Sequence, residues 1–318
     1  MKSITSNSTA RQYGKDGFVK GWSKDFKRNG SLYILFIPVA LFYILFCYRP
    51  MYGALIAFKD FSPRLGFAES PWVGFQNFKM FFSSVDFGTV LFNTLKISIS
   101  MLVFSFPLPI IFALFLNEMK SEKLKRFTQT ASYLPHFISM VVICGMIKTF
   151  VGSEGFIGIA VNRITGGNGS LLQQPECFLP IYVISGIWQG LGWDSIIYIA
   201  ALSGVDVQQY EAAEIDGAGR FKKMLNITLP SIAPTIVIML ILRVGQIMGV
   251  GYEKIILLYN PSIYKVSDVI ASYVYRMGFE TQDWGYSSAV GLFNSVINLI
   301  LLLSTNYISR KMTEISLW

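Results

Sequence analysis

The stretch EAAEIDGAGRFKKMLNITLP, residues 211–230, separates two long apolar segments of a 318-residue chain. It holds six charged side chains and two glycines, although only 14% of the whole chain is charged and 53% is hydrophobic. A segment this polar lies in hydrocarbon only at a large free-energy cost. It therefore indicates a loop at a membrane surface, and the apolar segments around it determine the fold.

Six apolar segments are candidates for membrane-spanning helices. A hydrocarbon layer about 30 Å thick requires ~20 apolar residues in a helix, and a backbone in lipid must satisfy its own hydrogen bonds. The third segment is the least regular, because Pro135 and His136 interrupt its start. We predict an all-α, polytopic membrane protein with spans near 31–48, 91–116, 131–151, 178–202, 231–250 and 286–308.

The net charge of +8 is distributed unevenly over this topology. With both termini inside, sixteen of the 27 Lys and Arg residues are cytoplasmic, eight are external and three lie within spans. This is the positive-inside bias of membrane proteins. We therefore expect a protein of the bacterial plasma membrane with both termini in the cytoplasm. The bias also accounts for the basic charge without a nucleic-acid partner.

The cytoplasmic tail (1–30) repeats Phe18, Trp22 and Phe26 at helical spacing, with lysines on other faces. This pattern predicts an amphipathic helix at the lipid surface; a disordered basic tail is the alternative. No cleavage signal precedes the first span, which we expect to be an uncleaved anchor. Residues 31–90 then hold the first span and an external loop, 91–310 a five-helix core, and 311–318 a second cytoplasmic tail.

Motifs for catalysis or metal binding are missing from the sequence. The three cysteines lack metal-ligand spacing, and His136, the one histidine, is interpreted as a structural residue. No phosphate-binding G-x-x-x-x-G-K-[ST] loop and no nucleophile elbow occur. We therefore predict that the chain is not an enzyme, binds no metal and holds no cofactor.

The charged stretch reads as a helix–turn–helix. Asp206 is a candidate helix cap, with Gln209 completing a capping box. Gly217 and Gly219 permit a sharp turn. A second short helix then carries the basic residues, and Pro230 stands at the start of the next span, where its missing N–H costs little.

The letters of this stretch fit the pattern E-A-A, three residues, G, nine residues, I-x-L-P. All seven fixed positions match: Glu211, Ala212, Ala213, Gly217, Ile227, Leu229 and Pro230. This resembles the EAA loop of the membrane subunits of binding-protein-dependent ABC importers. The segments WVGFQNF (72–78), NTL (93–95) and YLP (133–135) resemble those of sugar permeases. The segment RPMYGALIAFKDFSP (49–63) resembles the branch that handles oligosaccharides and polysaccharides.

The resemblance implies a type I ABC importer (MetI-like) permease fold and a coupling loop, 206–230, that docks a separate ATPase subunit. Glu211 and Gly217 would anchor that contact. ATP and Mg would belong to a dimer of ATPase subunits. A second, non-identical permease and an extracytoplasmic sugar-binding lipoprotein would complete an importer for carbohydrate.

Polar side chains within the fourth and fifth spans mark a candidate substrate path, because lipid penalises them. By helix rise, Gln189 and Gln246 lie about 20 and 22 Å above the cytoplasmic ends of their helices. Trp188 and Trp193 offer aromatic faces that suit sugar rings. We predict that these four residues line the path; roles in helix packing are the alternative.

Asp194 and Arg243 lie deeper toward the cytoplasm and within reach of each other, so we predict a structural ion pair. The spacings Gly186–Gly190 and Gly245–Gly249 predict close helix approach. Two other functional classes compete with the importer. A secondary transporter would use as many spans without an ATPase dock, and an intramembrane enzyme lacks a nucleophile–base pair.

Overall fold

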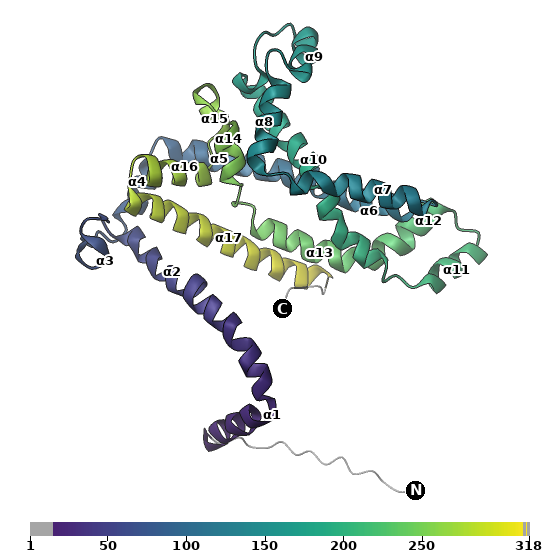
Figure 1. Ribbon diagram of the computed structural model, residues 1–318, viewed down its shortest axis with the longest axis horizontal. Helices are drawn as coiled ribbons and strands as arrows, with labels where there is room; N and C mark the ends of the chain where they lie inside the picture. Colours follow the sequence, from purple (N-terminus) through teal and green to yellow (C-terminus); the bar gives the residue numbers. More distant parts are fainter. Residues whose placement is uncertain (1–14, 314–315, 317–318) are drawn as a thin grey trace. The chain divides into compact units, whose positions relative to one another are not determined.

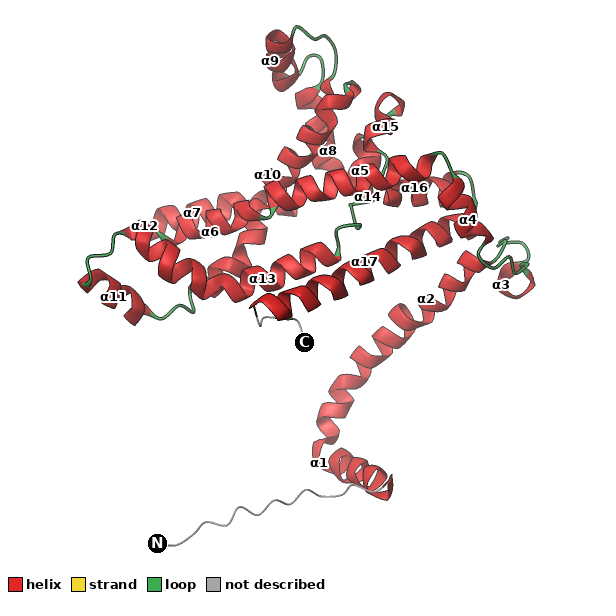
Figure 2. Cartoon of the chain, turned by 180° about the vertical axis from the view of Figure 1, so that it is seen from behind, coloured by secondary structure: helices red, strands yellow, loops and turns green. Residues whose placement is uncertain are grey.

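The computed structural model describes residues 15–313 and Ser316, with side chains described from Arg28 to Lys311 and at Ser316. Figure 2 shows helices joined by loops throughout this part of the chain, and its β-structure is one isolated bridge between Lys59 and Trp72. The all-α prediction is confirmed for the described residues. The chain divides into two units, residues 1–55 and 56–318.

The first unit holds the first predicted span. Helix α1 (Lys15–Phe42) contains one non-helical residue, Asn29, and continues through a π-helical segment (Tyr43–Tyr48) into α2 (Arg49–Met51). The run Arg28–Phe58 is long and apolar enough to cross a membrane. Its apolar side chains between Leu32 and Tyr48 are largely exposed, which fits contact with lipid. This run contains the predicted span 31–48.

The segment before Asn29 is helical from Lys15 onward. The side chains of Phe18, Trp22 and Phe26 lie outside those that the structure describes. Their placement at a lipid surface therefore stays a prediction.

The predicted external loop of the second unit contains a 3-10 turn (Tyr52–Phe58, which begins in the first unit), α3 (Gly66–Glu69) and α4 (Gln76–Ser83). Asn77 on α4 is buried, and its Nδ2 donates to the carbonyl oxygens of Ala57 at 3.0 Å and Lys59 at 3.1 Å. This amide ties α4 to the end of the 3-10 turn and to the residue that follows it.

The second span consists of α5 (Asp86–Ser100), a π-helical segment (Met101–Ser105) and α6 (Pro107–Asn117). Proline lacks an N–H, and its ring clashes with the carbonyl four residues earlier. A wide π turn accommodates both effects. The same arrangement recurs before Pro50 and Pro230, and at each of these prolines the helical run continues instead of ending.

The predicted third span, 131–151, is not one helix. Helix α7 (Glu122–Tyr133) runs into a 3-10 turn (Leu134–Phe137), and α8 (Met140–Val151) leaves at 98°. Ser139 starts the new helix, because its side chain accepts a hydrogen bond from the Val142 N–H at 3.4 Å. Beyond α8 follow α9 (Phe156–Thr165) and a 3-10 turn (Leu171–Gln173).

The predicted fourth span, 178–202, lies in α10 (Pro175–Leu202), whose 28 residues extend about 42 Å. It packs against α6, α7 and α13. By length and composition the described residues hold four membrane-crossing helices, or five if the bent pair is one span, and α10 is not among them. Its tryptophans, Gln189 and Asp194 lower its apolar character. The predicted count of six spans is therefore not confirmed.

The fifth span begins earlier and ends earlier than predicted. After α11 (Val207–Ile215), the run Arg220–Gly245 is one helix built from α12 (Arg220–Lys223), a π-helical segment (Met224–Thr228) and α13 (Leu229–Gly245). The predicted separate second helix of the loop is thus the first turn of the span. Gln246 leaves the helical conformation (φ −112°, ψ 16°), which ends the span before residue 250.

Residues 252–280 fold into short helices between the last two spans. These are α14 (Tyr252–Leu258), a 3-10 turn (Pro261–Ile263), α15 (Tyr264–Ser267), α16 (Ile270–Tyr275) and a π-helical segment (Arg276–Glu280). Buried hydrogen bonds join them to α5, where the Asn93 Nδ2 donates to the Asp268 carbonyl at 3.0 Å. The last span is α17 (Trp284–Thr313), which contains the predicted 286–308.

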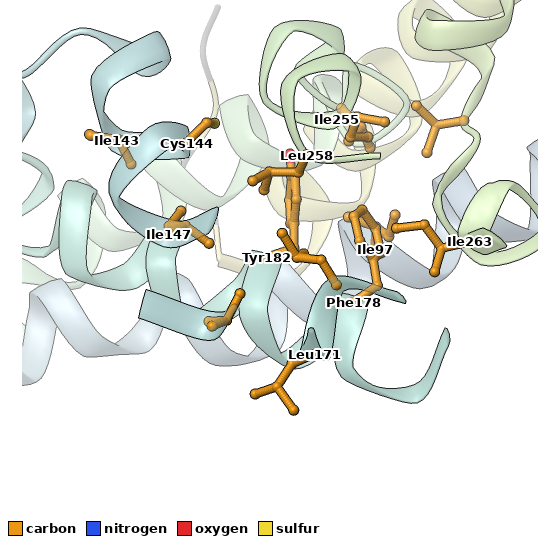
Figure 3. Packing of buried hydrophobic residues seen from close by; sticks show 14 residues of the cluster. Ile97, Ile143, Cys144, Ile147, Leu171, Phe178, Tyr182, Ile255, Leu258 and Ile263 are labelled. Carbon is orange, nitrogen blue, oxygen red and sulfur yellow. The ribbon is translucent and has the colours of Figure 1, made fainter. Parts of the chain in front are cut away.

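Three apolar clusters hold the second unit together, and Figure 3 shows one of them. Lipid is as apolar as these side chains, so close packing rather than removal from water favours their association. The cluster in Figure 3 joins α5, α8, α10 and α14. The second joins α4, α5, α16 and α17, and the third joins α6, α10 and α13 next to the polar residues of the candidate path.

Candidate functional site

The first turn of α11, the helix that begins the charged loop, is capped by a side chain. The Asp206 carboxylate accepts a hydrogen bond from the Gln208 N–H at 2.9 Å. The predicted capping box with Gln209 is wrong in detail, since the cap takes its bond from the second helical residue. Figures 1 and 2 show α11 set apart at one end of the second unit, with a loop on either side.

Gly217 ends α11 with a left-handed residue (φ +73°). The Ala218 N–H donates to the Ala213 carbonyl at 2.8 Å, and the Gly217 N–H donates to the Glu214 carbonyl at 3.0 Å. These two bonds form a Schellman motif, which places a residue without a Cβ at this position. No atom lies within 4 Å of a Cβ added to Gly217, so the backbone angle and not crowding in this chain requires glycine.

The EAA residues form an open surface. Glu211, Ala212, Gly217 and Pro230 are exposed, and Ala213, Ile227 and Leu229 are half-buried. Large apolar side chains accompany them: Ile215 is 87% exposed, Phe221 68% and Val207 64%. Exposed apolar groups grouped beside charged ones are typical of a protein contact.

Two contacts that the sequence did not identify tie α11 to the following span. The Tyr210 and Thr228 hydroxyls lie 2.9 Å apart, and Thr228 is buried in the π-helical segment. Lys223 Nζ and Glu214 Oε2 form an ion pair at 3.2 Å. These two contacts connect α11 directly to the helix that becomes α13.

The Asp194–Arg243 ion pair predicted from the sequence is present between α10 and α13. One hydrogen bond joins Arg243 Nη2 to Asp194 Oδ2 at 3.1 Å. The Arg243 side chain is 48% exposed and the Asp194 side chain is 36% exposed, so neither is buried. They line a cavity of about 250 Å³ together with Tyr198, Met239 and Gln246.

The two tryptophans of α10 face different neighbours. Five residues of helix separate them, which turns their side chains about 140° apart. Trp188 lines an apolar cavity of about 450 Å³ between α8, α9 and α10. Trp193 stacks on His136, with ring centroids 4.3 Å apart and planes at 1°, and meets Phe137 edge-on.

The predicted path residues are therefore not gathered in one cavity. Gln246 lines two cavities next to the ion pair, whereas Gln189 is half-buried on α10 and lines neither of them. The sequence identifies His136 only as a structural residue. Its stacking partner depends on the bend after Phe137, which no local pattern places against α10.

The close helix contacts differ in part from the predicted glycine pairs. A Cβ on Gly245 would meet the Leu302 side chain of α17, and one on Gly186 would meet Met101. Gly190 faces the Asp194 side chain of its own helix, and Gly249 lies beyond the end of α13 and faces the Gln246 carbonyl. The tightest approach of α10 falls on Gly192, where the backbone of Ser132 on α7 leaves no room for a Cβ.

Comparison with known proteins places this geometry in a family. Residues 105–314 match the model of the binding-protein-dependent transport system inner membrane component. The curated protein LplB of Bacillus subtilis is 44% identical over 92% of this chain and 92% of its own length. The polygalacturonan/rhamnogalacturonan transport system permease protein YteP of Bacillus subtilis is 39% identical over 89% of this chain and 88% of its own length.

Solved structures agree with the fold. A chain of a bacterial ABC transporter involved in the import of the acidic polysaccharide alginate is 41% identical, with a TM-score of 0.84 over 92% of this chain and 99% of that chain. A second structure of an alginate ABC transporter, in complex with an alginate pentasaccharide-bound periplasmic protein, gives 39% identity and a TM-score of 0.83.

These matches rule out a secondary transporter and an intramembrane enzyme. Members of the matched family are the inner membrane components of transport systems that depend on a binding protein. The multi-pass helices, the exposed loop after α10 and the matched residues 105–314 lead to one conclusion. This chain belongs to the family of inner membrane components of binding-protein-dependent transport systems, the permease subunits of ABC importers.

Proposed function

We propose that this chain is the permease subunit of an ATP-driven importer that passes oligosaccharides of acidic polysaccharides across a bacterial cell membrane. The related transporters named for alginate and for polygalacturonan/rhamnogalacturonan, 41% and 39% identical, support this substrate class. An extracytoplasmic binding lipoprotein delivers the sugar. A second, non-identical permease completes the path.

The observation that carries the proposal is the exposed end of α11. A helix that ends in a Schellman motif at Gly217, with Ile215 and Phe221 exposed beside it, presents a preformed surface to a partner. In the assembled importer this surface docks a dimer of ATPase subunits, which bind ATP and Mg. Glu211 adds a negative charge to the contact.

Docking performs work only if the ATPase subunits bind two states of the permease with different affinities. ATP-driven closure of the ATPase dimer moves α11. The Tyr210–Thr228 and Glu214–Lys223 contacts pass that movement to the helix Arg220–Gly245, which carries Arg243 next to the path cavity. The chain thus couples ATP hydrolysis in a partner to the opening of its own helices.

The orientation proposed is that of the sequence prediction, with both termini cytoplasmic. The start of α7, α11 and α12 lie at the same end of the second unit (Figure 1), and two of these elements carry clusters of basic residues. The positive-inside bias assigns that end to the cytoplasm, where an ATPase subunit can reach it.

The test is ATP-driven uptake of labelled trigalacturonate by proteoliposomes that contain the complete importer and its binding protein. Gly217→Trp should abolish uptake and release or uncouple the ATPase, while the membrane level of the chain stays normal. Gly219→Ala is the matched control, because Gly219 has an ordinary φ of −67° and open space around it.

Gly217→Asn separates docking from backbone strain, since asparagine tolerates the left-handed conformation. It should retain more ATPase binding than Gly217→Trp. Normal uptake by the tryptophan variant would refute docking at this loop. Uptake that vanadate does not inhibit would refute the ATP-driven mechanism.

A further inference from the structure

Arg243 and Gln246 border two cavities in the second unit. The first, of about 170 Å³, is lined by Ile97, Ser98, Tyr182 and Gly251 among others. The second, of about 250 Å³, is lined by Ser105, Pro109, Asp194 and Tyr198 among others. Arg243 and Gln246 are the two residues that line both.

The two cavities follow each other along the helices. The first lies beside residues 97–102 of the run Asp86–Asn117, and the second lies beside residues 105–109. On α10 the same order holds, with Tyr182 at the first cavity and Tyr198 at the second. Arg243 and Gln246 are therefore the side chains that a solute would meet in either cavity.

The ion pair that Arg243 forms beside these cavities is built to be exchanged. A single hydrogen bond of 3.1 Å joins the two side chains, although a guanidinium can offer a carboxylate two parallel N–H donors. Both partners are partly exposed, and exposed pairs contribute little to stability. A second carboxylate can therefore replace Asp194 at low cost.

A different ion pair in the same chain shows what a structural pair looks like. Arg276 Nη2 lies 2.6 Å from Asp268 Oδ2, with the side chains 18% and 6% exposed. The Ser272 hydroxyl donates to Asp268 Oδ1 at 2.7 Å, and the Arg276 guanidinium lies over the rings of Tyr264 and Tyr273. Every one of these contacts restrains the Asp268–Arg276 pair, and none of this kind surrounds Arg243 among the described contacts.

We propose that Arg243 is a carboxylate-binding residue of the transport path, which releases Asp194 and binds the uronate carboxylate of the passing oligosaccharide. Asp194 then acts as the resting partner that keeps the guanidinium occupied between substrates. The Gln246 amide, on the same wall, offers a donor and an acceptor to the sugar hydroxyls. This inference rests on the proposed function and gives it the residue that selects acidic sugars.

The experiment compares uptake of trigalacturonate and of its methyl ester in proteoliposomes with the complete importer and its binding protein. The readout is the ratio of acid uptake to ester uptake. The contribution of the binding protein and the amount of importer cancel when a variant's ratio is divided by that of the wild type. Variants are Arg243→Gln, Arg243→Lys and Asp194→Asn.

Arg243→Gln should lower the ratio about tenfold, because a hydrogen bond to a charged group is lost for the acid alone. Arg243→Lys should restore part of it, since lysine keeps the charge without the planar fork. Asp194→Asn should keep or raise the ratio, because it removes the competing carboxylate. If the wild type does not transport the ester, only the uptake rate of the acid is compared. Arg243→Gln should then lower this rate, and Asp194→Asn should keep or raise it.

An unchanged ratio in Arg243→Gln, or equal losses in Arg243→Gln and Asp194→Asn, would show that the pair is structural and would overturn the inference while transport by the wild type stands. Asp268→Asn and Arg276→Gln provide the matched pattern for a structural pair, since both should lower acid and ester uptake alike. Failure of the wild type to carry either sugar would instead refute the proposed function itself.

Discussion

The contact between α10 and α7 at Gly192 yields the sharpest prediction about stability. A Cβ on Gly192 would lie closer than 3.0 Å to the Ser132 carbonyl oxygen and carbon, and at 2.8 Å from its hydroxyl. Backbone atoms cannot rotate away, so Gly192→Ala must push the two helices apart by several tenths of an ångström. Gly190→Ala, two residues earlier, meets only the Asp194 side chain at 3.3 Å.

The expected cost follows from two opposing effects. Overpacking of a well-packed contact costs about 1–3 kcal/mol. Replacement of glycine by alanine within a helix returns up to ~1 kcal/mol in both variants. The difference between the two variants is therefore about 1–3 kcal/mol, which corresponds to a melting temperature roughly 2–10 °C lower for Gly192→Ala.

The assay is thermal unfolding of the detergent-purified importer, followed by fluorescence-detected size exclusion of the tagged chain. The pair Gly192→Ala and Ser132→Ala should melt like Gly192→Ala alone, because the carbonyl that blocks the Cβ belongs to the backbone. Equal melting temperatures for Gly190→Ala and Gly192→Ala would refute the close approach. Rescue by Ser132→Ala would show that only the hydroxyl was in the way.

Three further outcomes are expected. Asp268→Asn should destabilise the protein by about 3–5 kcal/mol, because it leaves the Arg276 charge without its partner in a buried site; thermal unfolding measures this, and a loss below 1 kcal/mol would contradict it. Asp206→Ala should cost about 1 kcal/mol of local helix stability and lower ATP-coupled uptake at a normal membrane level; full uptake would show that the α11 cap is dispensable for docking. In a chain without its native cysteines, Asn168→Cys should be labelled from outside and Ser121→Cys only after permeabilisation; the reverse pattern would overturn the proposed orientation.

The sequence predicts those features that depend on a few neighbouring residues. The apolar runs identify most of the spans, since hydropathy depends on local composition and a helix in lipid needs no partner for its backbone. The EAA letters identify the loop, and Asp206 and Gly217 act where the pattern places them, because caps and left-handed turns are local. Asp194 and Arg243 form a pair because two helices at similar depth bring unlike charges together.

Other features depend on contacts between distant segments and were not accessible to sequence reasoning. Pro135 indicates an interrupted helix, but the 98° bend and the stacking of His136 on Trp193 involve the packing of α10 against α7 next to Gly192, which no local pattern specifies.

The division of Trp188 and Trp193 between opposite faces of α10 follows from which helices meet each face. The sequence by itself determined that polar groups lie within the spans. Because lipid penalises such groups, it also indicated that they face other helices or a path. Only the tertiary structure decided that Arg243 and Gln246 line two cavities, because the position of a cavity depends on how several helices pack at once.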